Sequence, residues 1–431
     1  MKFLRLIVLY NVSVFLLGSM NVFAAGSGAF RVETPDAGAF GKGSAFVGEA
    51  NTPAAIFYNP AGLSQINKAE ISVGTTYLAP QVNYEASSGT EVQMQRNSFW
   101  IPHLYAAVPI SDKLIVGFGA TSYFGLGTEW APDSPLRYEA TKSSIIDKNY
   151  MLTSSFQATD QWSIAVSVDN DDSHADKSRK VFQSTGLDDA NQQLKVKDNA
   201  WGFRIATMYK VNNQHQFGLM YRSRINHTYH GKAYLTGLNN AGSTPFAAIF
   251  GGSSYETKVT EKFTLPQSVV VGYSYKPNNK WTFNFDLEWM DWSSVKREAL
   301  NWTDETDPTR LAVLNNGNPV PHDWHSVWSQ AIGAEYSATE RLRLRGGYYH
   351  HASPVPQATW DPNLPDASSH GFTTGFGYDL SKNLTLDMAY SMLIYQQRKI
   401  NNTVGDGLGS PVDGQYKQIM NIVMATMTYK F

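Results

Sequence analysis

The sequence predicts an all-β protein, a fourteen-stranded antiparallel transmembrane β-barrel that encloses an N-terminal hatch. Three observations support this prediction: runs of alternating apolar and polar residues, connections that are alternately short and long, and an unusual composition. Aromatic residues make up 13% of the chain, yet the mean hydropathy is only −0.32. A barrel wall has this composition because apolar side chains facing lipid alternate with polar side chains facing the lumen.

Residues 1–24 are expected to form a secretory signal peptide. Lys2 and Arg5 give a positive start, residues 6–17 are mostly apolar, and the stretch ends on Ala24, a small residue typical of a cleavage site. The apolar part is too short to cross a bilayer as a helix, and no later stretch approaches about 18 consecutive apolar residues. We therefore expect an exported chain that begins at Ala25 and has no membrane-spanning helix.

Residues 25–68 do not have the pattern of strands. Six glycines fall between Gly26 and Gly48, and Tyr58-Asn59-Pro60-Ala61-Gly62 follows. Several apolar residues, including Phe30 and Phe40, give this segment enough apolar surface to pack against something. A cylinder of about fourteen strands has a lumen that needs filling. We therefore expect residues 25–68 to form a hatch, or plug, inside a barrel made by residues 69–431.

The barrel strands are predicted from period-2 alternation, which places successive side chains on opposite faces. The clearest run is Trp281–Trp289, where five apolar residues alternate with four polar ones. An even number of strands puts both ends of the barrel on the same, periplasmic side. Fourteen such runs begin near residues 69, 98, 113, 142, 161, 199, 214, 257, 280, 324, 341, 371, 384 and 416.

The connections between these runs alternate in length. Short turns are expected at 111–112, 159–160, 212–213, 277–279, 337–339 and 381–383. Longer polar stretches lie at about 85–97, 127–141, 170–198, 236–256, 294–322, 352–370 and 398–415. In a transmembrane barrel the short turns are periplasmic and the long loops extracellular, whereas a soluble β-sandwich has no reason to alternate in this way.

The last strand, Val423–Phe431, ends the chain on an aromatic residue. One face carries Val423, Met427, Tyr429 and Phe431, an ending that resembles the C-terminal signature of bacterial outer-membrane barrels. This strand is expected to pair with the first strand near residue 69, which closes the barrel and removes both edges. Its inner face is apolar at residues 422 and 424, where a water-filled porin would be polar, and this favours a hydrophobic cargo.

Composition and motifs also exclude several functions. The chain has no cysteine and a formal charge of −2, so disulfides, thiolate chemistry and a nucleic-acid partner are not expected. No Gly-x-Ser-x-Gly elbow occurs, and His322 and His325 lack a third ligand at a metal-binding spacing. We therefore expect no catalytic residue, no metal and no cofactor. An outer-membrane barrel enzyme and a general diffusion porin remain as alternatives.

The Asn59-Pro60-Ala61 motif, placed after a glycine-rich N-terminal segment, resembles the FadL family of outer-membrane long-chain fatty acid transporters, which also includes channels for aromatic hydrocarbons. The resemblance covers residues 25–431 and depends on the order of several motifs. The other motifs are 121–130 with Arg137-Tyr138, Trp201-Gly202-Phe203, Tyr221-Arg222-Ser223, Leu265-Pro266, Trp292-Ser293 and Ser353-Pro354-Val355-Pro356. Two features depart from the family: the first Phe, Phe30, comes six residues into the mature chain, and residues 367–370 replace an Asp-Arg pair.

The resemblance implies a fourteen-stranded barrel with a hatch, and it implies positions for the working parts. Phe30, Asn59, Pro60 and Ala61 are expected in the ligand pocket and the hatch, with hatch movement around the Asn-Pro-Ala motif. A kinked third strand is expected to open the wall sideways at Tyr123, Phe124 and Gly125. Glycine inside a strand marks a bend, so the sequence itself permits a kink there. The candidates for binding a ligand head group are Arg179, Lys180, Lys296 and Arg297.

The implied function is uptake of hydrophobic molecules across the bacterial outer membrane by a monomeric protein. Long-chain fatty acids are the expected ligand, and monoaromatic hydrocarbons are the alternative. A carboxylate would pair with a basic side chain, whereas an uncharged aromatic ligand needs no such group. Each basic candidate has a second interpretation, namely a solvated surface charge that binds lipopolysaccharide phosphate. Lipopolysaccharide and outer-membrane lipid are therefore expected partners.

Overall fold

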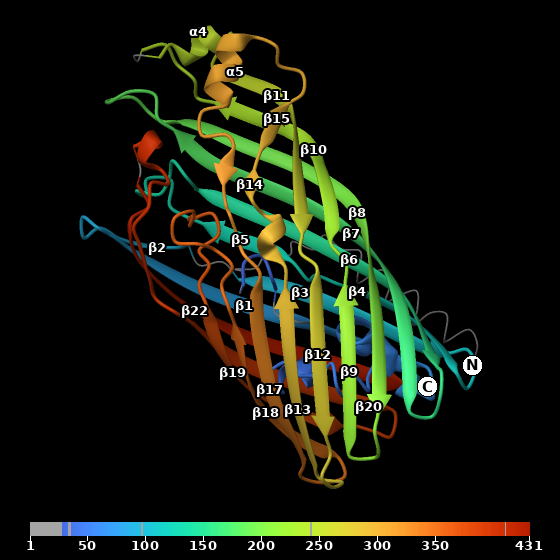
Figure 1. Ribbon diagram of the computed structural model, residues 1–431. Coiled ribbons are helices and arrows are strands. Elements are labelled where there is room, and N and C mark those ends of the chain that lie inside the picture. The colour runs from blue at the N-terminus through green and yellow to red at the C-terminus, as the bar shows by residue number, and fades with distance from the viewer. Residues whose placement is uncertain (1–27, 33–35, 96–97, 242–243, 410) are drawn as a thin grey trace.

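The computed structural model describes residues 28–32, 36–95, 98–241, 244–409 and 411–431. The expected signal peptide, residues 1–24, and the first three residues of the expected hatch lie outside the described residues. The described chain forms a tall, slanted barrel of antiparallel strands, with the helices α4 (Phe246–Phe250) and α5 (Pro308–Leu314) at one end and short hairpin turns at the other (Figure 1). No helix in the described part is long and apolar enough to cross a membrane.

Fourteen antiparallel strands form the closed wall, as predicted. Strand β22 (Gly414–Lys430) pairs with β1 (Glu70–Ala86) along its whole length, and the N–H of Phe431 donates to the carbonyl of Ala69 over 2.9 Å, which closes the cylinder as expected. Three barrel strands are interrupted and appear as the pairs β4/β5, β9/β10 and β11/β12.

The other wall elements are β3 (Phe99–Pro109), β4 (Leu114–Thr121), β5 (Gly125–Glu129), β6 (Lys142–Gln157), β7 (Trp162–Val181), β8 (Ala190–Lys210), β9 (His215–Arg222), β10 (Ile225–Thr236), β11 (Ser254–Leu265), β12 (Ser268–Tyr275), β13 (Trp281–Met290), β17 (Val327–Ser337), β18 (Leu342–His351), β19 (Ser369–Asp379) and β20 (Leu384–Tyr395). Short strands in the long connections are β2 (Glu91–Gln93), β14 (Arg297–Glu298), β15 (Leu300–Trp302), β16 (Val320–Pro321) and β21 (Arg398–Ile400).

One predicted loop is wrong. Residues 170–198 were expected to be a long polar connection, but β7 continues to Val181 and β8 begins at Ala190. The outward face of this hairpin is charged there, so it lacks the lipid-facing apolar pattern that marks the other strands. Leu194 and Val196 still alternate inward and are buried, and the two strands remain paired up to the Val181–Ala190 pair. The barrel wall is therefore taller on this side than the sequence suggested.

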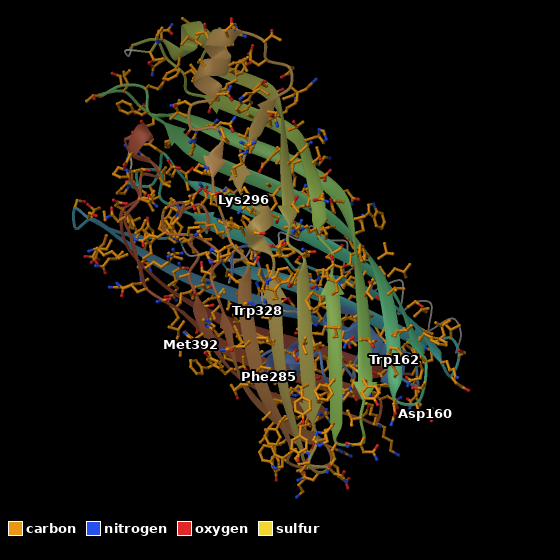
Figure 2. All side chains as sticks on the ribbon, in the orientation of Figure 1. Asp160, Trp162, Phe285, Lys296, Trp328 and Met392 are labelled. Atoms are coloured by element: carbon orange, nitrogen blue, oxygen red, sulfur yellow. The ribbon has the colours of Figure 1, made fainter. Side chains whose placement is uncertain are left out.

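A belt of exposed apolar side chains surrounds the wall, as expected for a surface that faces lipid. Along β7 it comprises Trp162, Ile164, Val166 and Val168, which are roughly half exposed and alternate with buried small or polar residues. Figure 2 shows Phe285, Trp328 and Met392 on other parts of the wall, with Asp160 at a short turn and Lys296 toward the opposite end. The belt ends where the charged upper halves of β7 and β8 begin.

The N-terminal segment lies inside this cylinder, as predicted for a hatch. It contains α2 (Ala37–Phe40), α3 (Ala55–Tyr58) and the 3₁₀-helix η1 (Pro60–Gln65), and most of its apolar side chains are fully buried. The inward-facing side chains of Ile422 and Met424 belong to the same buried cluster as Phe40. At the end of the barrel with the long loops, α4 (Phe246–Phe250) packs against α5 (Pro308–Leu314). The remaining short helices are η2 (Trp292–Ser294) and η3 (Asp406–Leu408).

Candidate functional site

The larger part of the hatch, residues 36–65, which we term the hatch body, touches the wall backbone to backbone. Four inward-facing wall glycines permit this close approach, because an added Cβ would lie only 2.1–2.3 Å from a hatch backbone atom. These glycines are Gly218 on β9, Gly272 on β12, Gly333 on β17 and Gly347 on β18. Asp286, which is directly opposite Gly272 on the neighbouring strand, accepts hydrogen bonds from the N–H groups of Phe46 (2.8 Å) and Val47 (2.9 Å).

The Asn59-Pro60-Ala61 motif anchors the hatch body from the other side. The Asn59 side chain accepts from the N–H of Ala61 at the start of η1 and donates to the carbonyl of Val47 over 2.9 Å. The hydroxyls of Ser155 and Ser163, on β6 and β7, donate to the carbonyl of Ala61. The three motif residues are buried and line neither of the two lumen cavities described below. Their local chemistry is that of a helix cap tied to the wall.

An outer cavity of about 130 Å³ lies at the end of the barrel with the long loops. Its apolar lining comes from hatch, strand and loop, and includes Phe30, Leu126, Leu194 and Trp324. The ring of Phe30 sits within 5.4–6.0 Å of the rings of Phe263, Trp292 and Trp324. Such an aromatic surface binds apolar molecules well.

Charged groups line the same cavity above this apolar floor. Lys177 forms an ion pair with Glu298 over 2.6 Å, so its charge is already compensated. Burial opposes ionisation of Glu298, but Lys177 and the nearby His322 hold the pKa of that carboxyl well below its usual range. The Nε of Arg179 donates to the side-chain oxygen of Gln192 over 2.6 Å, and no ion pair of Arg179 within 4 Å is found among the described residues.

The four basic residues singled out from the sequence do not come together. Arg179 lines the outer cavity, whereas Lys180, Lys296 and Arg297 line neither cavity. Lys180 donates to the side chain of Asn191, and Lys296 and Arg297 are exposed.

Glu139 lines the outer cavity near Arg179. Burial and then the charge of Asp361 raise the pKa of Glu139 to about 7, while the charge of Arg179 lowers it.

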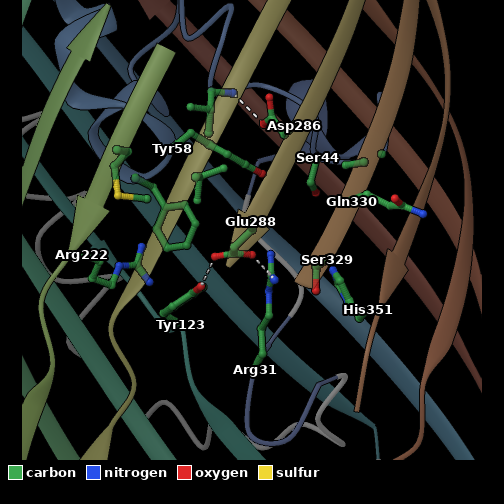
Figure 3. A pocket seen from close by; sticks show the side chains of 16 residues that line it. Arg31, Ser44, Tyr58, Tyr123, Arg222, Asp286, Glu288, Ser329, Gln330 and His351 are labelled. Carbon is green, nitrogen blue, oxygen red and sulfur yellow. Dashed lines mark hydrogen bonds and ion pairs between the residues drawn. The ribbon is translucent and has the colours of Figure 1, made fainter. Parts of the chain in front are cut away.

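An inner cavity of about 50 Å³ lies deeper in the lumen, between the hatch and β9, β12, β13 and β17 (Figure 3). Arg31 and Glu288 form an ion pair across it, and the Tyr123 hydroxyl donates to the other oxygen of Glu288 over 3.3 Å. The Arg222 guanidinium lies 3.6 Å from the centre of the Tyr123 ring. The apolar lining of the inner cavity comprises Val47, Phe57, Met220, Val270 and Ala331.

The two cavities are separated by residues 28–32, which we term the lead segment. Phe30 lines the outer cavity, whereas its neighbour Arg31 lines the inner one. The lead segment pairs with the third barrel strand: the N–H of Val32 donates to the carbonyl of Tyr123, and the N–H of Gly125 donates to the carbonyl of Phe30. These two hydrogen bonds form an isolated antiparallel bridge between Arg31 and Phe124.

The third barrel strand is interrupted at this point. Strand β4 ends at Thr121 and β5 begins at Gly125, so Ser122, Tyr123 and Phe124 leave the ladder. Pairing between β3 and β4 extends only as far as Leu104–Ala120. In the described part of the chain, residues 99–103 of β3 pair with β1 on one side and with no strand on the other. The wall therefore lacks its hydrogen-bonded ladder beside Tyr123 and Phe124.

Sequence reasoning missed most of the inner cavity. Glu288 and Asp286 were visible only as lumen-facing charges on an alternating strand, and Arg222 only as part of a Tyr-Arg-Ser motif. Nothing in the sequence pairs Arg31 with Glu288, which is 257 positions away. An ionisable residue on the lumen face of a strand was the one available signal.

Comparison with known proteins supplies an independent view of the chain. Residues 18–431 match the family described as "Outer membrane protein transport protein (OMPP1/FadL/TodX)". The chain is 26% identical to outer membrane protein NMB0088 of Neisseria meningitidis, over 97% of this chain and 98% of that protein. It is 22% identical to the long-chain fatty acid transport protein of Escherichia coli K12, over 84% of this chain and 87% of that protein.

Solved structures show the same fold. A Pseudomonas aeruginosa FadL homologue superposes with a TM-score of 0.81 at 19% identity, covering 94% of this chain and all of that one. The Ralstonia pickettii toluene transporter TbuX superposes with a TM-score of 0.70 at 16% identity, covering 93% of this chain and all of that one. At these identities the likeness concerns the arrangement of the barrel and its hatch.

Proposed function

Because the chain belongs to the outer membrane transport protein family that includes OMPP1, FadL and TodX, we propose that it takes up hydrophobic molecules across the bacterial outer membrane, with long-chain fatty acids as its main ligands. One observation supports this function above the others. The lead segment contributes Phe30 to an aromatic outer cavity and Arg31 to a small inner cavity, and the inner cavity adjoins the interrupted third strand.

The physical problem is to move a greasy molecule without exposing it to water. Each methylene is worth about 0.8 kcal/mol on leaving water, so a chain of about 16 carbons prefers any apolar surface strongly. A tight site alone would trap the ligand, so a second state of lower affinity is needed. We assign the first site to the outer cavity and the exit to the wall beside Tyr123 and Phe124, with Gly125 as the hinge of the interruption.

The head group of the ligand is assigned to Arg179 in the outer cavity. This guanidinium has no ion pair among the described residues, and a carboxylate would provide one next to the apolar floor around Phe30. Lys180, Lys296 and Arg297 line neither cavity, and we assign them no part in ligand binding. Asn59, Pro60 and Ala61 hold the hatch body in place.

Monoaromatic hydrocarbons are the second candidate, because structures of toluene transporters share the fold. The experiment is growth of a transporter-null strain carrying this chain on oleate and, separately, on a monoaromatic carbon source. We expect growth on oleate, and a large loss of it in Arg179→Gln. Growth on the aromatic compound alone would overturn the fatty acid assignment.

The family consists of transport proteins, and we propose that this chain has no chemical turnover and no open pore. A hatch that fills the lumen should exclude small sugars. In liposome swelling assays we therefore expect slow permeation, and rapid swelling with small sugars would favour a general porin.

We also propose that lipopolysaccharide contacts the tall side of the barrel. Lys195 on β8, Lys232 on β10 and Lys258 on β11 are direct neighbours across three adjacent strands, and they point outward. Like charges directly opposite each other are unfavourable unless an anion covers them. Among the described residues Glu256 pairs with Lys232, which leaves the two flanking lysines without an ion pair.

The three lysines Lys195, Lys232 and Lys258 also lie far enough above the apolar belt to reach the lipopolysaccharide head groups. Lys195 lies six positions along β8 from Trp201, a 65% exposed residue of the apolar belt, and thus about 20 Å along the strand. Neutralising Lys195 and Lys258 to Gln should lower the amount of lipopolysaccharide that copurifies, while neutralising Lys296 and Arg297 serves as the matched control. Equal amounts in both variants would contradict the contact.

We propose that the barrel acts as a monomer within this lipid.

A further inference from the structure

The inner cavity is lined by Arg222, which, like Arg179 in the outer cavity, forms no ion pair among the described residues. Arg222 ends β9, its exposure is only 3%, and it lines the cavity beside Tyr123 (Figure 3). Its Nε and Nη1 atoms are buried and have no hydrogen-bond partner among the described residues, and no carboxylate there lies within 4 Å of the guanidinium. Its contacts are with the faces of two rings, Tyr123 at 3.6 Å and Phe57 at 5.0 Å.

A neighbouring arginine shows how the barrel normally satisfies such a group. Arg204 on β8 is directly opposite Arg222 in the β8–β9 register, and it is equally buried. It forms an ion pair with Asp169 over 2.7 Å and donates to the carbonyl of Ile56 over 3.1 Å. It also donates to the side-chain oxygen of Asn149 over 3.0 Å. Acidic partners are thus available in this part of the wall, and a shortage of them does not explain why Arg222 has no ion pair.

The carboxylates that line the inner cavity are already occupied. Glu288 binds Arg31 and Tyr123, and Asp286 accepts the N–H groups of Phe46 and Val47. Neither carboxylate therefore pairs with Arg222. Burying an unpaired charge is costly for a protein, so a residue retained in this state is a candidate for binding an anion that comes from outside.

We propose that Arg222 binds the carboxylate of a long-chain fatty acid in the inner cavity, as a second head-group site before the ligand leaves beside Tyr123. This inference rests on the proposed function. The volume of about 50 Å³ is enough for a head group but not for an acyl chain, so the chain must extend past the lead segment or toward the interrupted strand. Val270 and Met220 offer apolar contacts for the first methylenes.

The site also discriminates between the two classes of ligand. A guanidinium and a carboxylate form a charge-assisted pair with two parallel hydrogen bonds, whereas an uncharged aromatic molecule gains nothing from it. Arg179 and Arg222 thus mark two cationic positions on either side of the lead segment. A ligand with a carboxylate can pass from one position to the other without its charge being left unpaired in the lumen.

The test is to compare Arg222→Gln and Arg222→Lys with the wild-type protein in uptake of oleate and of the uncharged oleyl alcohol. Loss of a charged hydrogen-bond partner corresponds to about a 10- to 100-fold change in affinity. We expect oleate uptake by Arg222→Gln to fall by about tenfold or more, Arg222→Lys to recover part of it, and oleyl alcohol uptake to be unchanged. An equal fall for both ligands would mean that Arg222 only positions Tyr123, and would overturn the proposal.

A binding measurement separates this inference from the proposed function. Oleate labelled with carbon-13 at its carboxyl is added to the purified protein in nanodiscs, and the pKa of the bound carboxyl is read from the chemical shift. We expect a bound population whose pKa is lower than that of oleate in empty nanodiscs and rises in Arg222→Gln. An unchanged bound population would refute the inner site while wild-type uptake of oleate still supported the transport function. Failure of the wild type to take up any hydrophobic ligand would refute the function itself.

Discussion

The hatch body and the lead segment belong to one continuous stretch of chain, yet they are held in very different ways. The hatch body lies against four wall glycines and donates backbone N–H groups to the Asp286 carboxylate. Its carbonyls at Ala61 and Ile56 accept hydrogen bonds from side chains of β6, β7 and β8. In the described part of the chain the contacts of the lead segment include two backbone hydrogen bonds to the third strand, the Arg31–Glu288 ion pair, the Asp366 carboxylate at the N–H groups of Gly28 and Ala29, and the rings around Phe30.

This difference teaches which part of the hatch can act as the moving element. Segments open locally with a free energy that follows their buried contacts, and elements that move are drawn from the weakly held end of the range. Displacing the hatch body would expose many buried groups at once. Displacing the lead segment would break fewer contacts, would join the outer and inner cavities, and would release Tyr123 and Phe124.

The largest effect should come from a change that keeps the hatch body from docking. A side chain at Gly347 would meet the backbone of Lys42 and Gly43 at about 2.3 Å, so Gly347→Val must push the hatch off the wall. We expect a barrel that admits small sugars in liposome swelling and that melts at a clearly lower temperature.

Gly346→Val is the matched control for this change. Gly346 is the preceding residue of β18, and an added Cβ there would have its nearest neighbour at 4.0 Å, the carbonyl oxygen of Thr373. This variant should remain closed to sugars. A Gly347→Val barrel as tight and as stable as the control would mean that the hatch body is not fixed by this contact.

The sequence was informative about the wall and about the presence of a hatch. Alternation of apolar and polar residues is set by the two faces of each strand, and it located the beginnings of the strands to within about three residues, except that the sixth strand begins at Ala190. The division of the hatch could not be predicted, because it depends on wall glycines such as Gly272 and Gly333, which look in the sequence like weak points of ordinary strands.

The candidate site was predictable only in part, for a related reason. Phe30 and Arg179 line the outer cavity, and the third strand is interrupted just before Gly125. The charge state of a buried group, however, depends on partners that are distant in sequence. Arg222 and Arg204 look alike in the chain, and only the three-dimensional arrangement distinguishes the paired arginine from the unpaired one.

A second prediction concerns the interrupted strand. Gly125 resumes the ladder beside Phe30 and is buried, so Gly125→Leu should fill the space beside the interruption. We expect oleate uptake to be lost while oleate still binds at the outer cavity, as measured by calorimetry with the folded protein. Unchanged uptake by a folded variant would remove the lateral exit from the mechanism.

A third prediction concerns the ion pair that holds the lead segment. Glu288→Gln removes the partner of Arg31, and loss of one member of a charged hydrogen-bonded pair costs about 1–3 kcal/mol. We expect amide hydrogen exchange to become faster in residues 28–32 and to stay unchanged in the hatch body. The double variant Arg31→Gln/Glu288→Gln should be no more open than the single variants. Faster exchange throughout both segments would show that they open together.

The smallest effect should be a pH dependence at the outer cavity, on the far side of the lead segment. Because burial and Asp361 raise the pKa of Glu139 to about 7, this carboxyl loses its proton as the pH rises through 7 and then competes with a ligand for Arg179. The raised pKa of Glu139 also means that its contribution to folding stability is complete below about pH 4.5 and is lost as the pH rises through 7.

Competition between Glu139 and the ligand for Arg179 can be measured by calorimetry. Relative to Glu139→Gln, the wild-type affinity for oleate should fall about two- to fivefold between pH 6 and pH 8. Since the ligand's own carboxyl titrates equally in both proteins, the difference between them isolates Glu139. Parallel profiles would mean that Glu139 does not sense the ligand, and the outer cavity would then lack the electrostatic coupling that the inner cavity has through Glu288.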